Sequence, residues 1–306
     1  MSDIIVGLDI GTSAIRAVVA EKLETGVLQI IGVGTGISEG LRKGTVVNIE
    51  KTVQGIHEAV EAAEMMSGVE ITHCITGIGG THIEGLNSRG IVAVTDKGKG
   101  NREIDQQDID RVIEAAKAVV IPMDRCVMHV IPQSYIVDDQ RGIADPHNVI
   151  GVRIEAEVHI VTGSVTCIKN IVDCVKRANL QVDAPMYHGL AAVESVMTQE
   201  EQELGSVLID IGGGTTDIVV MSGGAPILTT VLPVGGGHAT NDLAIVKGLS
   251  TETAEKLKIT DGCCWQPLLE DNKSVLISAP GGRAPIQIEK ADICDILQAR
   301  MAEIFT

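Results

Sequence analysis

The stretch Asp210-Ile-Gly-Gly-Gly-Thr-Thr-Asp217 decides the fold of this chain. It follows a short apolar strand expected over residues 206–211. Consecutive glycines let the backbone turn sharply and bring its N–H groups against a phosphate, and Thr215 and Thr216 can add hydroxyl donors. The pattern predicts a phosphate-binding hairpin, although a hairpin turn without any ligand would look the same.

A second stretch near the start, Ile5-Val-Gly-Leu-Asp9-Ile-Gly-Thr-Ser13, repeats the order of strand, acid, glycine and hydroxyl. A carboxylate at the end of an apolar strand is unfavourable unless a cation faces it. We therefore predict that Asp9 and Asp210 position Mg²⁺, mostly through water. The two turns together predict a clamp on the phosphates of one nucleotide, formed by Gly11, Thr12, Ser13, Gly212, Gly213, Gly214, Thr215 and Thr216.

Composition bounds the class of protein. The chain has 306 residues, which suggests about two domains, and a formal net charge of −17. Nucleic-acid binding is not expected, because it needs a basic surface. The sequence contains no run of eighteen apolar residues and begins Met1-Ser2-Asp3, without the basic start of a signal peptide. We expect a soluble protein that is not secreted.

The seven cysteines form no C-x-x-C pair and no cluster with zinc-ligand spacing, which is typical of reduced thiols in a cytoplasm. Cys167 and Cys174 lie seven apart on one predicted helix and are interpreted as small packing residues. The adjacent Cys263 and Cys264 stand out, but no nearby histidine or acid completes a site.

The first half of the chain predicts a sheet and then a separate unit. Strands are expected at residues 4–10, 14–19 and 27–33, followed by a helix over residues 49–67 and a strand at residues 71–78. Asn48 can cap the helix and Gly68 can end it. Residues 1–82 are thus predicted to form a first core domain. Residues 83–163 then form a compact unit with strands at 90–94, 126–137 and 154–162 and a helix over 105–120.

The second half is expected to repeat this plan. A helix capped by Ser164, a strand at residues 180–183 and a helix at 189–197 lead to the Asp210 turn, which assigns residues 164–238 to a second core domain. Residues 239–306 are assigned to a further subdomain with an incomplete return to the second core. Such a duplication places a ligand in the cleft between the two halves.

Both glycine turns resemble the phosphate motifs of the actin, Hsp70 and sugar-kinase superfamily. The chain also resembles the FtsA family of bacterial cell-division proteins, through Ala115-Ala-Lys-Ala-Val119, Val127-Met-His-Val-Ile-Pro-Gln133, Glu155-Ala-Glu-Val-His-Ile-Val-Thr-Gly163, Val234-Gly-Gly236 and Thr240-Asn-Asp242. The resemblance implies an α/β, actin-like duplicated fold around a nucleotide cleft. Residues 83–163 would be the inserted subdomain called 1C.

The resemblance also implies the ligands. The nucleotide would be ATP with Mg²⁺, and Gly235 and Gly236 would add to its site. Glu255 and Lys258 would hydrogen-bond the ribose and base, whereas their spacing alone is equally consistent with a solvated ion pair.

The implied function is a scaffold that self-associates and links the tubulin-like FtsZ filaments to the cytoplasmic face of the membrane at the division site. Residues 83–163 would contact the same protein and other division proteins. The alternative is an enzyme of the same superfamily, a small-molecule kinase or a chaperone-type ATPase, because the fold alone does not decide the activity.

Two departures from the family pattern modify these expectations. His188 stands where the superfamily usually has a glutamate near the attacking water, so ATP hydrolysis is expected to be slow or absent. The family's C-terminal part is expected to be missing after Thr306, including the amphipathic helix that holds it on the membrane. Membrane binding would then require that helix to be supplied, because residues 290–305 carry both signs of charge.

Overall fold

The computed structural model describes residues 3–94, 102–269, 274–277 and 285–306. They form two compact units. Unit 1 comprises Met1–Asp210 and Asp217–Val231, and unit 2 comprises Ile211–Thr216 and Leu232–Thr306.

Unit 1 begins with a five-stranded sheet in the order β13-β6-β1-β2-β3. β1, β2 and β3 are an antiparallel meander, while β6 pairs parallel with β1 and β13 pairs parallel with β6. A short hairpin of β4 and β5 follows the meander. The bounds are Asp3–Ile10 (β1), Ala14–Lys22 (β2), Leu28–Ile37 (β3), Leu41–Arg42 (β4), Thr45–Val46 (β5), His73–Ile78 (β6) and Gln181–Tyr187 (β13). The predicted meander is confirmed.

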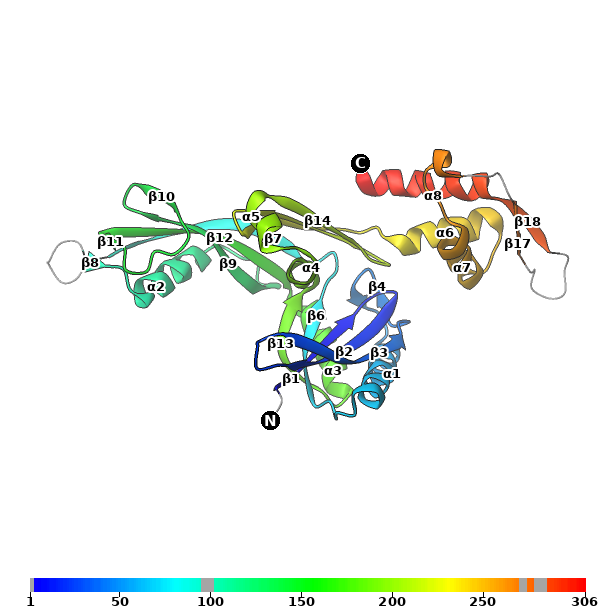
Figure 1. Ribbon diagram of the computed structural model, residues 1–306, viewed down its shortest axis with the longest axis horizontal. Coiled ribbons are helices and arrows are strands. Elements are labelled where there is room, and N and C mark those ends of the chain that lie inside the picture. Colours follow the sequence, from blue (N-terminus) through cyan, green and yellow to red (C-terminus); the bar gives the residue numbers. More distant parts are fainter. Residues whose placement is uncertain (1–2, 95–101, 270–273, 278–284) are drawn as a thin grey trace. The chain divides into compact units, whose positions relative to one another are not determined.

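Helix α1 (Ile49–Ser67) packs on strand β3 (Figure 1). It begins where the Asn48 side chain accepts the Lys51 N–H at 3.0 Å, and it ends at Gly68, whose φ of 71° favours glycine. The contact with β3 is very close, since a Cβ on Gly34 would lie 1.8 Å from the Ala59 carbonyl oxygen. Both ends of this helix are as the capping residues predict.

Helix α3 (Val165–Arg177) packs against α1 and β13, and β13 completes the first sheet. This differs from the assignment of residues 164–238 to a second core domain. The physical reason is the pairing: Gln181–Tyr187 hydrogen-bonds alongside His73–Ile78, so the chain returns to the first sheet after residues 83–163. Residues 164–187 therefore belong with the first core.

Residues 83–163 form a compact insert within unit 1. Its sheet has the order β10-β9-β12-β7, all antiparallel, and α2 packs on β7 and β12. A separate apolar core holds it together, with Val112, Ile154 and Ile160 fully buried. The bounds are Glu84–Ala93 (β7), Arg102–Glu103 (β8), Gln106–Lys117 (α2), Arg125–Val137 (β9), Gln140–Ile143 (β10), Ile150–Gly151 (β11) and Arg153–Ser164 (β12).

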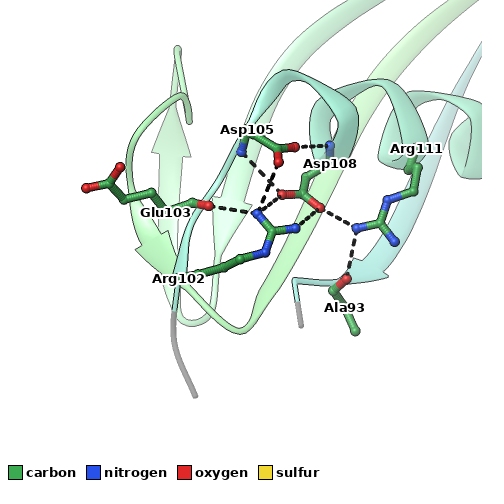
Figure 2. Close-up of polar contacts among 6 residues, drawn as sticks. All are labelled: Ala93, Arg102, Glu103, Asp105, Asp108 and Arg111. Carbon is green, nitrogen blue, oxygen red and sulfur yellow. Dashed lines mark hydrogen bonds and ion pairs between the residues drawn. The ribbon is translucent and has the colours of Figure 1, made fainter. Parts of the chain in front are cut away.

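A buried carboxylate fixes the start of α2, as Figure 2 shows. Asp105 accepts the Asp108 N–H at 3.0 Å and Asp108 accepts the Asp105 N–H at 3.2 Å, which is a capping box. Asp108 is 0% exposed and also accepts hydrogen bonds from Arg102 and Arg111. Burial opposes ionisation of Asp108, but these donors outweigh it and lower its pKa.

The Asp210 motif lies in a three-stranded sheet in the order β14-β15-β16, preceded by α4 and α5. Gly223 and Gly224, at φ values of 63° and 79°, form the turn between β15 and β16, as predicted. In unit 1, this hairpin contacts the insert through His159 and Thr229, whose side chains are 3.0 Å apart. The bounds are His188–Val196 (α4), Gln199–Leu204 (α5), Ser206–Ile211 (β14), Thr216–Ser222 (β15) and Ala225–Leu232 (β16).

Unit 2 is mainly helical. Its core packs α6 against α7 and α8 (Figure 1). Leu243, Ala254 and Ile293 are fully buried in this core. A two-stranded sheet of β17 and β18 precedes α8. The bounds are Gly236–Lys247 (α6), Thr251–Asp261 (α7), Gln266–Leu268 (η1), Ser274–Ile277 (β17), Ile286–Glu289 (β18) and Lys290–Phe305 (α8).

Candidate nucleotide site

In unit 2, the triple-glycine turn lies against a second glycine run at the start of α6. The Gly236 N–H donates to the Gly212 carbonyl and the Gly237 N–H donates to the Gly213 carbonyl, each at 2.8 Å. Within the turn, the Gly212 N–H donates to the Thr215 carbonyl at 2.9 Å. The sequence therefore folds its two glycine runs into one backbone cradle at a helix N-terminus, a place that favours anions.

Gly235 is required in this cradle by space rather than by backbone angle. Its φ of −168° is open to any residue, but an added Cβ would lie 2.4 Å from the Gly212 carbonyl oxygen. The adjoining Thr216 is fully buried and donates its hydroxyl to the Val234 carbonyl at 2.8 Å. The Thr216 side chain thus ties the first glycine run to the segment that leads into the second.

Glu255 and Lys258, both on α7, join the same cradle. Lys258 Nζ donates to the Gly236 carbonyl at 3.2 Å, to Thr240 Oγ1 at 2.9 Å and to Glu255 Oε2 at 2.7 Å. Burial opposes ionisation of Glu255, but hydrogen bonds from Lys258 and Thr240 lower its pKa. This is a part-buried network built onto the glycine run, which the ion-pair interpretation of the sequence did not anticipate.

The first glycine turn, in unit 1, is tied to its surroundings. The Gly11 N–H donates to the Ala14 carbonyl at 3.1 Å, and the Gly11 carbonyl accepts the Ser38 hydroxyl at 2.6 Å. Thr12 Oγ1 accepts the Gly44 N–H at 3.3 Å. The backbone of residues 11–14 is a tight turn at the end of β1, as the motif predicts.

His188 faces Asp9 in unit 1. Its Nε2 lies 3.3 Å from Asp9 Oδ1, and Arg16 approaches the same carboxylate at 3.5 Å. The imidazole packs against the end of β6, because a Cβ on Gly77 would lie 2.3 Å from His188 Nε2 and one on Gly79 would lie 2.5 Å from Nδ1. Two glycines therefore make room for the ring beside the predicted magnesium carboxylate.

Asp217, the last residue of the motif, is a buried carboxylate that interacts electrostatically with His188. It is 4% exposed, and burial raises its pKa to about 6, with the nearby Asp210 carboxylate adding to the rise. His188 and the Tyr187 side chain oppose that rise. Burial and the same two carboxylates raise the pKa of the Tyr187 hydroxyl.

Three polar atoms of this cluster are buried without a hydrogen bond of good geometry in the described structure: Tyr187 Oη, His188 Nε2 and Asp217 Oδ1. Each has a polar neighbour, because the Tyr187 hydroxyl faces the Asp217 carboxylate and His188 Nε2 lies 3.3 Å from Asp9 Oδ1. Buried polar groups are usually well hydrogen-bonded, so a hydrated ion is a suitable further partner for them. Within the described ranges, no three histidine, cysteine or acidic side chains converge as a metal site. The cluster suits Mg²⁺, which keeps several waters and completes its shell with substrate phosphates.

The structure thus brings the predicted residues together in two sets. Unit 2 joins Gly212–Thr216 with Gly235, Gly236, Glu255 and Lys258. Unit 1 joins Asp9 with His188, and Asp210 with Asp217. Sequence reasoning did not place Asp217 or Tyr187 in the site, although an acid ending the motif was a signal for the first.

Sequence profiles of known families match two parts of the chain. One, described as "SHS2 domain inserted in FTSA", covers residues 80–162, close to the predicted insert at 83–163. Another, described as "Cell division protein FtsA", covers residues 207–304.

Full-length relatives extend this match to nearly the whole chain. FtsA of Pseudomonas aeruginosa is 43% identical over 99% of this chain and 71% of its own length. FtsA of Borreliella burgdorferi is 44% identical over 99% of this chain and 73% of its own. FtsA of Escherichia coli K12 is 37% identical over 98% of this chain and 70% of its own.

Solved structures agree on the fold. A PilM-PilN type IV pilus biogenesis complex is similar with a TM-score of 0.65 and 16% identity, over 98% of this chain and 74% of that one. MreB5 of Spiroplasma citri bound to ADP has a TM-score of 0.53 and 14% identity, over 99% and 76%. The fold is actin-like, with an SHS2 insert. On these grounds the chain belongs to the FtsA family of bacterial cell-division proteins.

Proposed function

We propose that this chain is an ATP-binding, actin-like division protein that self-associates and links FtsZ filaments to the cytoplasmic face of the membrane. The observation that carries the nucleotide part is the cradle formed by Gly212 and Gly213 with Gly235–Gly237. An added Cβ on Gly235 or Gly237 would lie 2.4 or 2.7 Å from a carbonyl oxygen of the facing glycine run, so the two runs pack closely. They do so at the N-terminus of α6, where the helix dipole favours an anion. The ADP bound to the similar MreB5 supports the same choice of ligand.

The phosphates are proposed to bind Gly212, Gly213, Gly214, Thr215 and Thr216, together with Gly235 and Gly236. Gly11, Thr12 and Ser13, in the matching motif of unit 1, are proposed to bind phosphate as well. Lys258 and Glu255 are proposed to contact the nucleoside. The hydrogen bonds of Lys258 to the Gly236 carbonyl and to Glu255 support this choice.

Mg²⁺ is proposed to be held near Asp9 and Asp210, where it would neutralise phosphate charge. The buried Asp217 carboxylate and Tyr187 hydroxyl fit this proposal, because a hydrated ion would give both groups a further hydrogen-bond partner. The high pKa of Asp217 also fits, since a buried carboxylate without a cation prefers its neutral form.

ATP turnover is proposed to be slow or absent. His188 occupies the start of α4, 3.3 Å from Asp9, where a carboxylate base was expected from the superfamily pattern. A neutral imidazole can orient water but does not carry the charge of a carboxylate. A scaffold needs a nucleotide-dependent change of conformation rather than rapid chemistry.

The partners are proposed from family membership. FtsZ and further copies of the chain are the first, and residues 83–163 are proposed as the contact for self-association and for other division proteins. No helix in the described ranges is long and apolar enough to span a bilayer. Peripheral attachment through an amphipathic segment is proposed from family membership.

Co-sedimentation with FtsZ polymers tests this function. The chain should pellet with FtsZ, and ATP with Mg²⁺ should change the amount that pellets. Gly235→Ala is the informative variant, because it should remove the nucleotide effect. A chain that stays in the supernatant at every FtsZ concentration would refute the proposed link.

A further inference from the structure

Three of the seven cysteines lie in unit 2, two of them adjacent in the sequence and the third on the last helix. The loop after α7 carries Cys263 and Cys264, and α8 carries Cys294. Contacts on both sides fix the loop against α8. A Cβ on Gly262 would lie 3.0 Å from Leu297 Cδ1, and Gln266 Nε2 donates to Asp295 Oδ1 at 2.6 Å.

The exposure of the three thiols is graded. Cys294 is 0% exposed, Cys263 is part-buried and Cys264 is exposed. The Cys263 thiol donates to the Trp265 carbonyl at 3.3 Å, which holds it in place. Burial raises the pKa of the Cys294 thiol, and the neighbouring Cys263 thiol raises it further.

We propose that Cys263 and Cys294 are a thiol pair that forms an intramolecular disulfide under oxidising conditions. Cys264 is not a suitable partner for Cys263, because successive Cα atoms lie about 3.8 Å apart and a disulfide needs roughly 4.4–6.8 Å. Nothing in the nucleotide site uses these side chains, so the pair is a separate modification site.

The reaction is a thiol–disulfide exchange with a low-molecular-weight disulfide, RSSR. The Cys263 thiolate, which solvent reaches, attacks one sulfur of RSSR, giving a mixed disulfide and releasing RS⁻, which takes up a proton. The Cys294 thiol then loses its proton and attacks the Cys263 sulfur, forming the Cys263–Cys294 bond and releasing a second RSH. Two protein thiols are oxidised and one RSSR is reduced to two RSH.

The second step should be the slower one and should accelerate as pH rises. The thiolate is the attacking species, and Cys294 holds its proton more tightly than an ordinary thiol. The product ties the end of α7 to α8 and closes a loop of about thirty residues, which restricts the unfolded chain. We expect the thermal midpoint of the oxidised chain to be higher than that of the reduced chain.

The test is incubation of the whole chain with oxidised glutathione, followed by thiol titration in denaturant and peptide mapping without reduction. The titrated thiols should fall from seven to five in a chain that stays monomeric, with Cys263 and Cys294 in one cross-linked peptide pair. Cys264→Ser, which starts with six thiols, should fall to four and give the same cross-linked peptide pair. Cys294→Ala should instead stop at the mixed disulfide on Cys263.

Three results would overturn the proposal: seven thiols remaining after oxidation, a link between Cys263 and Cys264, or disulfides between chains. Because Cys294 is fully buried, its variant could fold poorly. The mapping of the unsubstituted chain and of Cys264→Ser decides the question without it.

Discussion

Replacing Asp217 with asparagine is expected to stabilise unit 1 at neutral pH in the absence of nucleotide. The carboxyl is 4% exposed, and burial first, with Asp210 second, raises its pKa from the ordinary 3.8 to about 6. The folded state therefore holds a proton that the unfolded state has released between these two values. Stability is highest below pH 3.8 and falls as pH rises toward 6.

The magnitude follows from that shift. About two pH units at 1.36 kcal/mol each give a destabilisation of about 3 kcal/mol above pH 7, shrinking to about 0.6 kcal/mol at pH 4. Asp217→Asn removes the charge and keeps the shape. The variant should then exceed the wild type by up to about 3 kcal/mol at pH 7.5 and by little at pH 4.

Urea unfolding followed by circular dichroism measures the difference, while the fluorescence of Trp265 reports unit 2 separately. Asp173→Asn, an exposed change in the same unit, is the matched control and should follow the wild type at both pH values. A gain of equal size at pH 4 and pH 7.5 would refute the reasoning, as would a wild type that is more stable than Asp217→Asn at pH 7.5.

Three further predictions concern the cradle, the catalytic position and the insert. Gly235→Ala should weaken ATP binding at least about 10-fold, because the new Cβ would lie 2.4 Å from a backbone oxygen and a tenfold loss needs only about 1.4 kcal/mol. Calorimetry measures the affinity, and an unchanged affinity would contradict the prediction. With His188 in place, phosphate release should stay below about 1 s⁻¹, and faster steady turnover would favour the enzyme alternative. Asp108→Ala should destabilise the insert by about 2–4 kcal/mol in urea, since two arginines lose a buried partner; a change under 0.5 kcal/mol would dismiss that role.

Local signals predicted much of the fold. The meander, helix α1 and most of the insert were expected from strand runs, capping residues and helical spacing, and they lie within a few residues of their expected positions. The first strand of the insert is the exception, because it was expected at residues 90–94 and spans Glu84–Ala93. Asn48 and Gly68 show why: both ends of α1 are set by hydrogen bonds and angles of residues next to the helix. Such features need no knowledge of the rest of the chain.

The return of β13 to the first sheet was not predictable in this way. Gln181–Tyr187 pairs with His73–Ile78 across the whole insert, and the strand itself does not reveal which sheet it joins. The expected internal duplication led us to assign this strand to the wrong sheet, that of a second core domain. Parallel pairing over such a separation is decided by tertiary packing, here of α3 against α1.

In the candidate site, too, the local features were predictable from the sequence and the long-range contacts were not. The glycine turns were predicted from sequence because their chemistry lies in consecutive residues. The approach of Tyr187 to Asp217, and of His188 to Asp9, depends on where β13 and α4 end. Sequence placed His188 in the site only through the family resemblance, and it gave no sign of the glycines at 77 and 79 that make room for its ring.

Equilibrium binding of ATP to the whole chain, with and without Mg²⁺, tests the central claim most directly. Calorimetry should find one nucleotide per chain, bound more tightly with Mg²⁺ than without it, and Asp210→Ala should abolish the Mg²⁺-dependent binding while circular dichroism shows an intact fold. Absence of binding, or equal binding by folded Asp210→Ala and wild type, would contradict the account.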